Sequence, residues 1–187
     1  MANRNTQGFG LVPAGTLGQT PATSGTGKYK IDAGYATTIY HGGAVSSTAG
    51  YIVEGQGTAD NPMIGVLNGI FYNAATTLKP TFSNHYVQVT PANSEDIDAF
   101  VFDNPQQQYV VATDDAVAQA GYLETYDMNA SAGSTTTGKS SSTLDIGDTS
   151  ADAAAFRLLR SAEDPENDEN AAFRSVVVCL NLIELQS

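Results

Sequence analysis

The clearest chemical motif in the sequence is a match to the phosphate-loop pattern G-x-x-x-x-G-K-[ST] between Gly133 and Ser140. In nucleotide-binding proteins the backbone amides of such a loop hold the phosphates, the lysine (here Lys139) contacts the β and γ phosphates, and the final hydroxyl binds magnesium. The loop must follow a buried strand and begin a helix, so that the helix N-terminus faces the anion. The residues after Ser140 are poor helix formers, and a Ser/Thr/Gly-rich stretch matches this pattern by composition alone. NTP binding is therefore the third of three functional hypotheses, and no cofactor is predicted.

Acidic residues are abundant, but their spacing does not define a metal site. The run 164–169 offers oxygen ligands suited to calcium, yet it lacks the Gly turn and distal Glu of an EF-hand loop. We interpret it as an exposed acidic hairpin loop. Asp96 with Asp98, and Asp145 with Asp148, are interpreted as solvated turn residues, and no metal ligand is predicted.

The two histidines, His41 and His85, belong to neither a metal-type spacing nor a G-x-S-x-G elbow. A triad that converges only in space cannot be identified from sequence. Paired carboxylates for glycoside hydrolysis meet the same limit, because none of the twenty acids stands in an aromatic, sugar-stacking setting. No catalytic residue is predicted, and the chain is expected not to be an enzyme.

Charge and composition narrow the possible partners. The net charge is −12, and the first 30 residues contain Arg4, Lys28 and Lys30 but no acid, which leaves −15 on the remainder. A protein domain with this negative charge repels the phosphate backbone of nucleic acids, so direct nucleic-acid binding is not expected. The sequence shows no signal peptide and no apolar stretch long enough to span a membrane, and its single cysteine, Cys179, lies in an apolar run. We expect a protein made and used in a reducing, aqueous compartment.

The elements that would position these groups are predominantly strands. The chain is rich in Gly, Thr, Val and Ser, and it contains short β-prone runs bounded by turn residues. The predicted strands are 29–31, 36–40, 44–46, 51–53, 64–72, 86–89, 97–102, 108–112 and 175–184. Gly65 and Gly69 indicate a bend or bulge in the longest early strand. The best helix candidate is 114–121, where two aspartates precede one or two helical turns and a Gly stop.

The predicted organisation is an extended N-terminal arm, residues 1–28, followed by one mainly β domain, residues 29–187, that is a β-barrel or β-sandwich with few short helices. Residues 131–150 are expected to form a flexible Ser/Thr-rich loop. The arm shows no strand or helix period, so we expect it to order against a partner and to add little to the stability of the body. Its sparse apolar residues are the candidate interface anchors: Phe9, Leu11, Val12 and Leu17.

The order of segments resembles a known family. It includes 64–69 (IGVLNG), 108–115 (QYVVATDD), 133–145 (GSTTTGKSSSTLD), 156–159 (FRLL) and a closing run ending at 181–184 (NLIE). Over residues 30–187 this pattern is similar to the small head decoration or cement proteins of tailed phages, encoded beside the major capsid protein. The Ala-rich stretch 151–155 and the last four residues depart from that pattern.

This resemblance implies a non-enzymatic virion protein that is made in the host cytoplasm, binds the major capsid protein on the capsid exterior and stabilises it. It implies self-association, with a trimer as first choice and a dimer as second, by analogy with other decoration proteins. It also favours a C-terminal β-hairpin over 155–186, where local propensity leaves helix and strand open. The alternative function is a receptor- or glycan-binding head or tail module.

Overall fold

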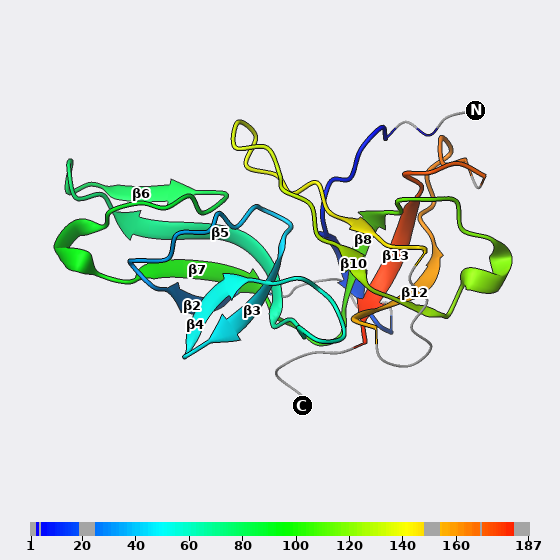
Figure 1. The fold of residues 1–187 in the computed structure, drawn as a ribbon, viewed down its shortest axis with the longest axis horizontal. Coiled ribbons are helices and arrows are strands. Elements are labelled where there is room, and N and C mark those ends of the chain that lie inside the picture. Colours follow the sequence, from blue (N-terminus) through cyan, green and yellow to red (C-terminus); the bar gives the residue numbers. More distant parts are fainter. Residues whose placement is uncertain (1–2, 4, 19–24, 148–153, 169, 182–187) are drawn as a thin grey trace.

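The computed structural model describes residues 3, 5–18, 25–147, 154–168 and 170–181, and it is mainly β, as expected. Figure 1 shows two β lobes arranged along the long axis. The six-stranded lobe has the strand order β2-β7-β5-β3-β4, with β6 also paired to β5. Its strands are β2 (Gly27–Ile31), β3 (Ala44–Thr48), β4 (Tyr51–Glu54), β5 (Gly65–Asn73), β6 (Pro80–Ser83) and β7 (Ile97–Phe102).

The second lobe, which we call the five-stranded lobe, has the order β1-β8-β13-β12-β9, and all of its pairs are antiparallel. Its strands are β1 (Val12–Thr16), β8 (Gln107–Ala112), β9 (Thr125–Tyr126), β12 (Phe156–Ser161) and β13 (Ser175–Leu180). A separate pair joins β10 (Met128–Asn129) to β11 (Thr143–Leu144). The described strands form no closed barrel: the edge strands β2 and β4 approach each other without pairing.

Helix is confined to two 3-10 turns in the described residues, η1 (Ala92–Ser94) and η2 (Gln119–Gly121). The helix predicted over 114–121 is wrong except for its last turn. Asp114 does not cap a helix, because its carboxylate accepts a hydrogen bond from the Ile146 amide at 2.9 Å. Asp115 accepts one from the adjacent Ala116 amide at 2.7 Å. No helix in the described part of the chain is long and apolar enough to cross a membrane.

Most of the predicted strands are confirmed, including the irregularity in β5, where the register against β7 shifts between Leu67 and Gly69. Segments 36–40 and 86–89 do not form strands. They meet only at one bridge, Ile39 with Tyr86, whose amides and carbonyls exchange hydrogen bonds of 3.0 and 2.8 Å. Both side chains are buried as in a strand, but the neighbouring residues do not continue the pairing into a ladder of hydrogen bonds.

The C-terminal hairpin is confirmed for β12 and β13, which pair from Phe156–Leu180 to Ser161–Val176. The segment 156–159 forms a strand despite its helix propensity, because Phe156 and Leu158 then both point into the core. β13 lies between β8 and β12 in the sheet and pairs with both. Cys179 is buried there, as expected, and burial raises the pKa of its thiol. The remainder of the predicted last strand, 182–184, lies outside the described residues.

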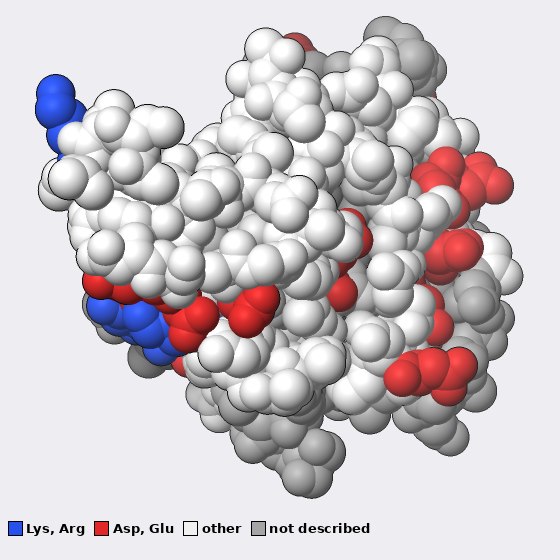
Figure 2. Space-filling model, turned by 60° about the vertical axis from the view of Figure 1, so that its left-hand side comes forward, with Lys and Arg blue, Asp and Glu red and all other residues white. Residues whose placement is uncertain are grey.

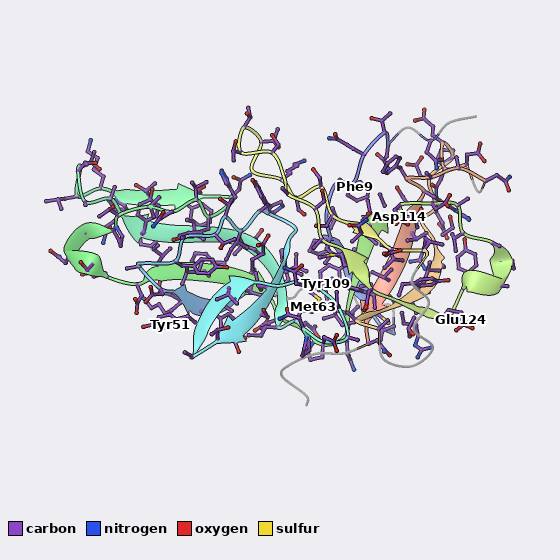
Figure 3. The ribbon with its side chains drawn as sticks, in the orientation of Figure 1. Phe9, Tyr51, Met63, Tyr109, Asp114 and Glu124 are labelled. Atoms are coloured by element: carbon purple, nitrogen blue, oxygen red, sulfur yellow. The ribbon has the colours of Figure 1, made fainter. Side chains whose placement is uncertain are left out.

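Each lobe has its own hydrophobic cluster, and the two clusters meet at β3 and β5. Neighbouring residues on these strands point to opposite sides: Val45 and Leu67 into the six-stranded lobe, Ala44 and Val66 toward the five-stranded lobe. Tyr109 and Met63 lie at this junction (Figure 3). The Tyr109 hydroxyl donates to the Phe102 carbonyl at 3.1 Å, and burial raises the pKa of this phenol. The lobes are therefore joined by packing as well as by chain connections.

The N-terminal segment differs from the expected arm. Val12–Thr16 forms β1, paired with β8, and Leu11 is buried in the core with its amide donating to the Gly42 carbonyl at 2.8 Å. Only glycine fits at position 8, because a Cβ added there would lie 2.0 Å from the Ser141 carbonyl oxygen. Residues 12–16 (VPAGT) show no apolar alternation, and their pairing partner β8 lies far away in the chain. The segment helps to build the body instead of standing apart from it.

Candidate functional site

Residues 133–140 form a hairpin-like turn and not a phosphate loop. The Ser134 amide donates to the Lys139 carbonyl at 2.9 Å, and the Gly138 amide donates to the Ser134 carbonyl at 2.7 Å. The chain then enters the short strand β11 instead of a helix, and the buried Ser140 hydroxyl donates to that of Ser142 at 2.9 Å. The arrangement that phosphate binding needs is therefore not formed by residues 133–147.

This turn is tied to the body, although a flexible loop was expected. The His41 backbone holds the turn with two hydrogen bonds. Its amide donates to the Gly138 carbonyl at 2.8 Å, and its carbonyl accepts from the Ser140 amide at 2.9 Å. The Asn84 side chain donates to the Thr137 carbonyl at 2.9 Å. In Figure 1 the turn is the yellow-green loop that projects from the upper side of the molecule. The last residues of the expected loop, 148–150, lie outside the described part of the chain.

The histidines support this region and have no described carboxylate partner. His41 Nδ1 lies 2.8 Å from the Asn68 carbonyl oxygen, and His85 Nδ1 lies 2.8 Å from the Asn84 side-chain oxygen. The His85 ring stacks on Tyr40, with ring centroids 6.2 Å apart. This geometry positions loops, and it does not assemble a nucleophile with a base.

The acidic residues singled out by the sequence fall into separate turns and one ion-paired cluster. Asp145 and Asp164 accept hydrogen bonds from backbone amides two residues ahead, at 2.9 and 3.0 Å, as turn residues do. Asp98 is ion-paired with Lys28 at 2.8 Å and with Lys30 at 2.7 Å. Burial works to raise the pKa of Asp98, but the two ammonium groups outweigh it and lower that pKa. Asp148 lies outside the described residues, and no group of three or more His, Cys, Asp or Glu in the described chain could hold a metal.

A hollow of about 300 Å³ at the outer end of the six-stranded lobe brings aromatic and acidic side chains together. It combines the aromatic residues Phe71 and Tyr72 with the carboxylates of Glu95 and Asp96 and with Lys30. Asp96 accepts a hydrogen bond from the Tyr51 hydroxyl at 3.2 Å. Sequence spacing does not reveal this site, because β5 and the segment after η1 come together only through the sheet.

Among the described residues, three exposed large apolar side chains lie in the same lobe, on β6 and in the segments that flank it. We call Leu78, Phe82 and Val87, which are 72%, 65% and 40% exposed, the apolar face. Phe82 lies beside Phe100 of β7, with ring centroids 5.7 Å apart. Figure 2 shows that much of this end of the molecule carries no charged side chains. The sequence alone does not mark this surface, because only the pairing of β6 with β5 shows which of these side chains are exposed.

The four predicted interface anchors do not share one environment. Leu11 is buried in the protein's own core and is not available to a partner, which corrects that part of the prediction. Val12 and Leu17 are exposed at the two ends of β1, and Phe9 is half-buried (labelled in Figure 3). Lys28 and Lys30, two of the three basic residues of the first 30, form ion pairs with Asp98 of the same chain.

Comparison with protein-family models, with curated proteins and with solved structures found no match.

Proposed function

We propose that this protein is a non-enzymatic virion protein that binds the outside of a tailed-phage capsid and stabilises it, as a decoration or cement protein. The observation that carries the proposal is the apolar face of Leu78, Phe82 and Val87 on a chain with net charge −12. Protein interfaces are depleted of charge and enriched in aromatic residues at their centre, so an exposed aromatic side chain such as Phe82 suits that position. The segment order described above supports the choice of a capsid as the partner.

Two features of the architecture suit this role. Phe82 lies on β6, a strand held by main-chain hydrogen bonds to β5, so it is presented without first being ordered. Such preorganisation reduces the entropy lost on binding. A capsid repeats the same docking site by symmetry, so modest contacts per copy add up to substantial stabilisation of the shell.

The test is co-sedimentation of the protein with heads assembled from the major capsid protein encoded in the same genome. We expect saturable binding that Phe82→Ser weakens by roughly tenfold or more, since a truncated interface aromatic commonly costs over about 1.4 kcal/mol. Phe82→Tyr is the matched control: it keeps the aromatic area and should retain binding. Equal binding by the Ser and Tyr variants, with unchanged melting temperatures, contradicts docking through this face.

Glycan binding is the second candidate, and the hollow beside Phe71 and Tyr72 favours it. An aromatic ring beside carboxylate acceptors suits a sugar, which has apolar C–H faces and hydroxyl donors. A glycan array should then report binding that Phe71→Ala removes. An array without signal rejects this candidate and leaves the capsid proposal untouched.

A further inference from the structure

The end of the molecule opposite β6 carries a second hollow, of about 330 Å³, which we call the arginine hollow. Its lining includes Arg160 and Arg174 together with Tyr122, Leu123 and Leu159. It lies between the turn around η2, at the far right of Figure 1, and the end of β12. Two guanidinium groups beside apolar side chains are unusual in a chain with eight basic and twenty acidic residues.

The two arginines play different parts. Arg174 is buried, donates to the Val117 carbonyl at 3.4 Å and has its guanidinium carbon 5.6 Å from the centre of the Tyr122 ring. Arg160 is exposed and forms no ion pair with a described residue. The guanidinium fork of Arg160 matches the two oxygens of a carboxylate. The hollow therefore offers one accessible cation, Arg160, beside the buried Arg174.

Leu123 adds an exposed apolar side chain to the arginine hollow, and its backbone has a strained conformation. It is 62% exposed and has a backbone φ of +68°, in the left-handed region that β-carbon-bearing residues disfavour. Its amide donates to the Leu158 carbonyl at 2.8 Å, and its carbonyl accepts from Arg157 at 2.7 Å. These bonds fix Leu123 in place, and strained residues of this kind concentrate at binding sites.

An acidic loop emerges from the rim of the hollow, because both belong to the β12–β13 hairpin. Glu163 and Asp164 follow the end of β12 closely, and both are exposed. Side-chain hydrogen bonds tie the loop to β13: the Asn167 side chain donates to the Ser175 carbonyl at 2.8 Å and accepts from the Ser175 amide at 2.9 Å. The Asn3 side chain also donates to the Ala172 carbonyl at 2.9 Å. Glu163 has no hydrogen-bond or ion-pair partner among the described residues.

We propose that the arginine hollow binds the acidic loop of a second copy of this chain, with Glu163 of each copy meeting Arg160 of the other. Opposite charges that lie side by side on one surface are self-complementary under a two-fold axis, where each contact occurs twice. Tyr122, Leu123 and Leu159 supply the apolar part of the contact. The result is a dimer, the second of the two oligomers expected from the sequence.

Sedimentation velocity of the full chain, without heads, tests the pairing independently of capsid docking. We expect a concentration-dependent dimer that weakens as salt rises, because exposed charges are screened. Arg160→Glu should weaken association at least tenfold. The double variant Arg160→Glu with Glu163→Arg should restore it, because the swapped charges again meet across the axis.

Lys79→Glu is the control, since it reverses a cation at the opposite end of the molecule and should leave association unchanged. Melting temperatures establish that each variant is folded. A monomeric wild type, an Arg160→Glu variant that associates like the wild type, or a double variant that stays monomeric overturns the proposal.

Discussion

Glu54, the last residue of β4, is half-buried beside Met128 at the junction of the lobes. Burial raises the pKa of its carboxyl above the ordinary 4.5, because the ionised form loses hydration. The folded protein thus binds this proton more tightly than the unfolded chain does. Its contribution to stability is present below pH 4.5 and is lost as the pH rises through the raised folded pKa.

We therefore expect Glu54→Gln to stabilise the protein at pH 7 by up to about 1 kcal/mol, a value discounted for partial exposure. The gain should shrink toward zero below the unfolded pKa, where wild-type Glu54 is itself neutral. Urea unfolding at pH 7 and pH 4 measures both effects. A gain of equal size at the two pH values would show that the carboxylate charge is not the cause.

Leu11 and Val12 form a matched pair, since they are adjacent and are 2% and 45% exposed. Leu11→Ala should cost about 2–5 kcal/mol, as for other buried leucines. Val12→Ala should change stability by less than about 0.5 kcal/mol. Chemical denaturation of both variants is the measurement, and equal losses would contradict the placement of Leu11 in the core.

Lys139 is exposed on a turn whose backbone groups bond to each other and to His41. We expect Lys139→Ala to leave the melting temperature and head binding unchanged, and we expect neither form to bind Mg-ATP. Isothermal titration calorimetry checks this directly. Saturable ATP binding that depends on Lys139 would revive the nucleotide-binding hypothesis.

The pairing of β1 with β8 makes the N-terminal segment part of the folded domain, whereas an arm that adds little to stability was expected. Deletion of residues 1–17 removes Leu11 and exposes the edge of β8, so we expect the melting temperature to fall by roughly 10 °C or more. Differential scanning calorimetry of the shortened chain measures this. A melting curve that matches the full chain would instead restore the idea of an arm outside the body.

Local patterns in the sequence were sufficient for the strands whose burial alternates along the chain, such as β7, and for the β12–β13 hairpin. They were insufficient where a segment without apolar alternation is ordered by remote residues: Val12 pairs with Val110, and Asn3 bonds to Ala172, 169 residues away. The candidate surfaces were hidden for the same reason. Phe82 is exposed on a strand whose pairing with β5 the sequence does not predict, and the arginine hollow forms only when η2 lies against β12.

At the scale of the whole molecule, the two lobes offer different surfaces at opposite ends of the long axis (Figure 1). The six-stranded lobe presents the apolar face, and the five-stranded lobe presents the arginine hollow with its acidic loop. The packing of Tyr109 and Met63 with Ala44 and Val66 joins the two lobes. The two proposed contacts therefore use different surfaces and do not compete with each other.

The most direct test of capsid decoration is cryo-electron microscopy of heads assembled from the cognate major capsid protein and incubated with this protein. We predict ordered density on the outer surface at symmetry-related positions, with β6 and Phe82 against the capsid and η2 facing away from it. Heads that remain bare at saturating protein, or density in which β6 faces solvent, would show that the protein does not decorate capsids through this surface.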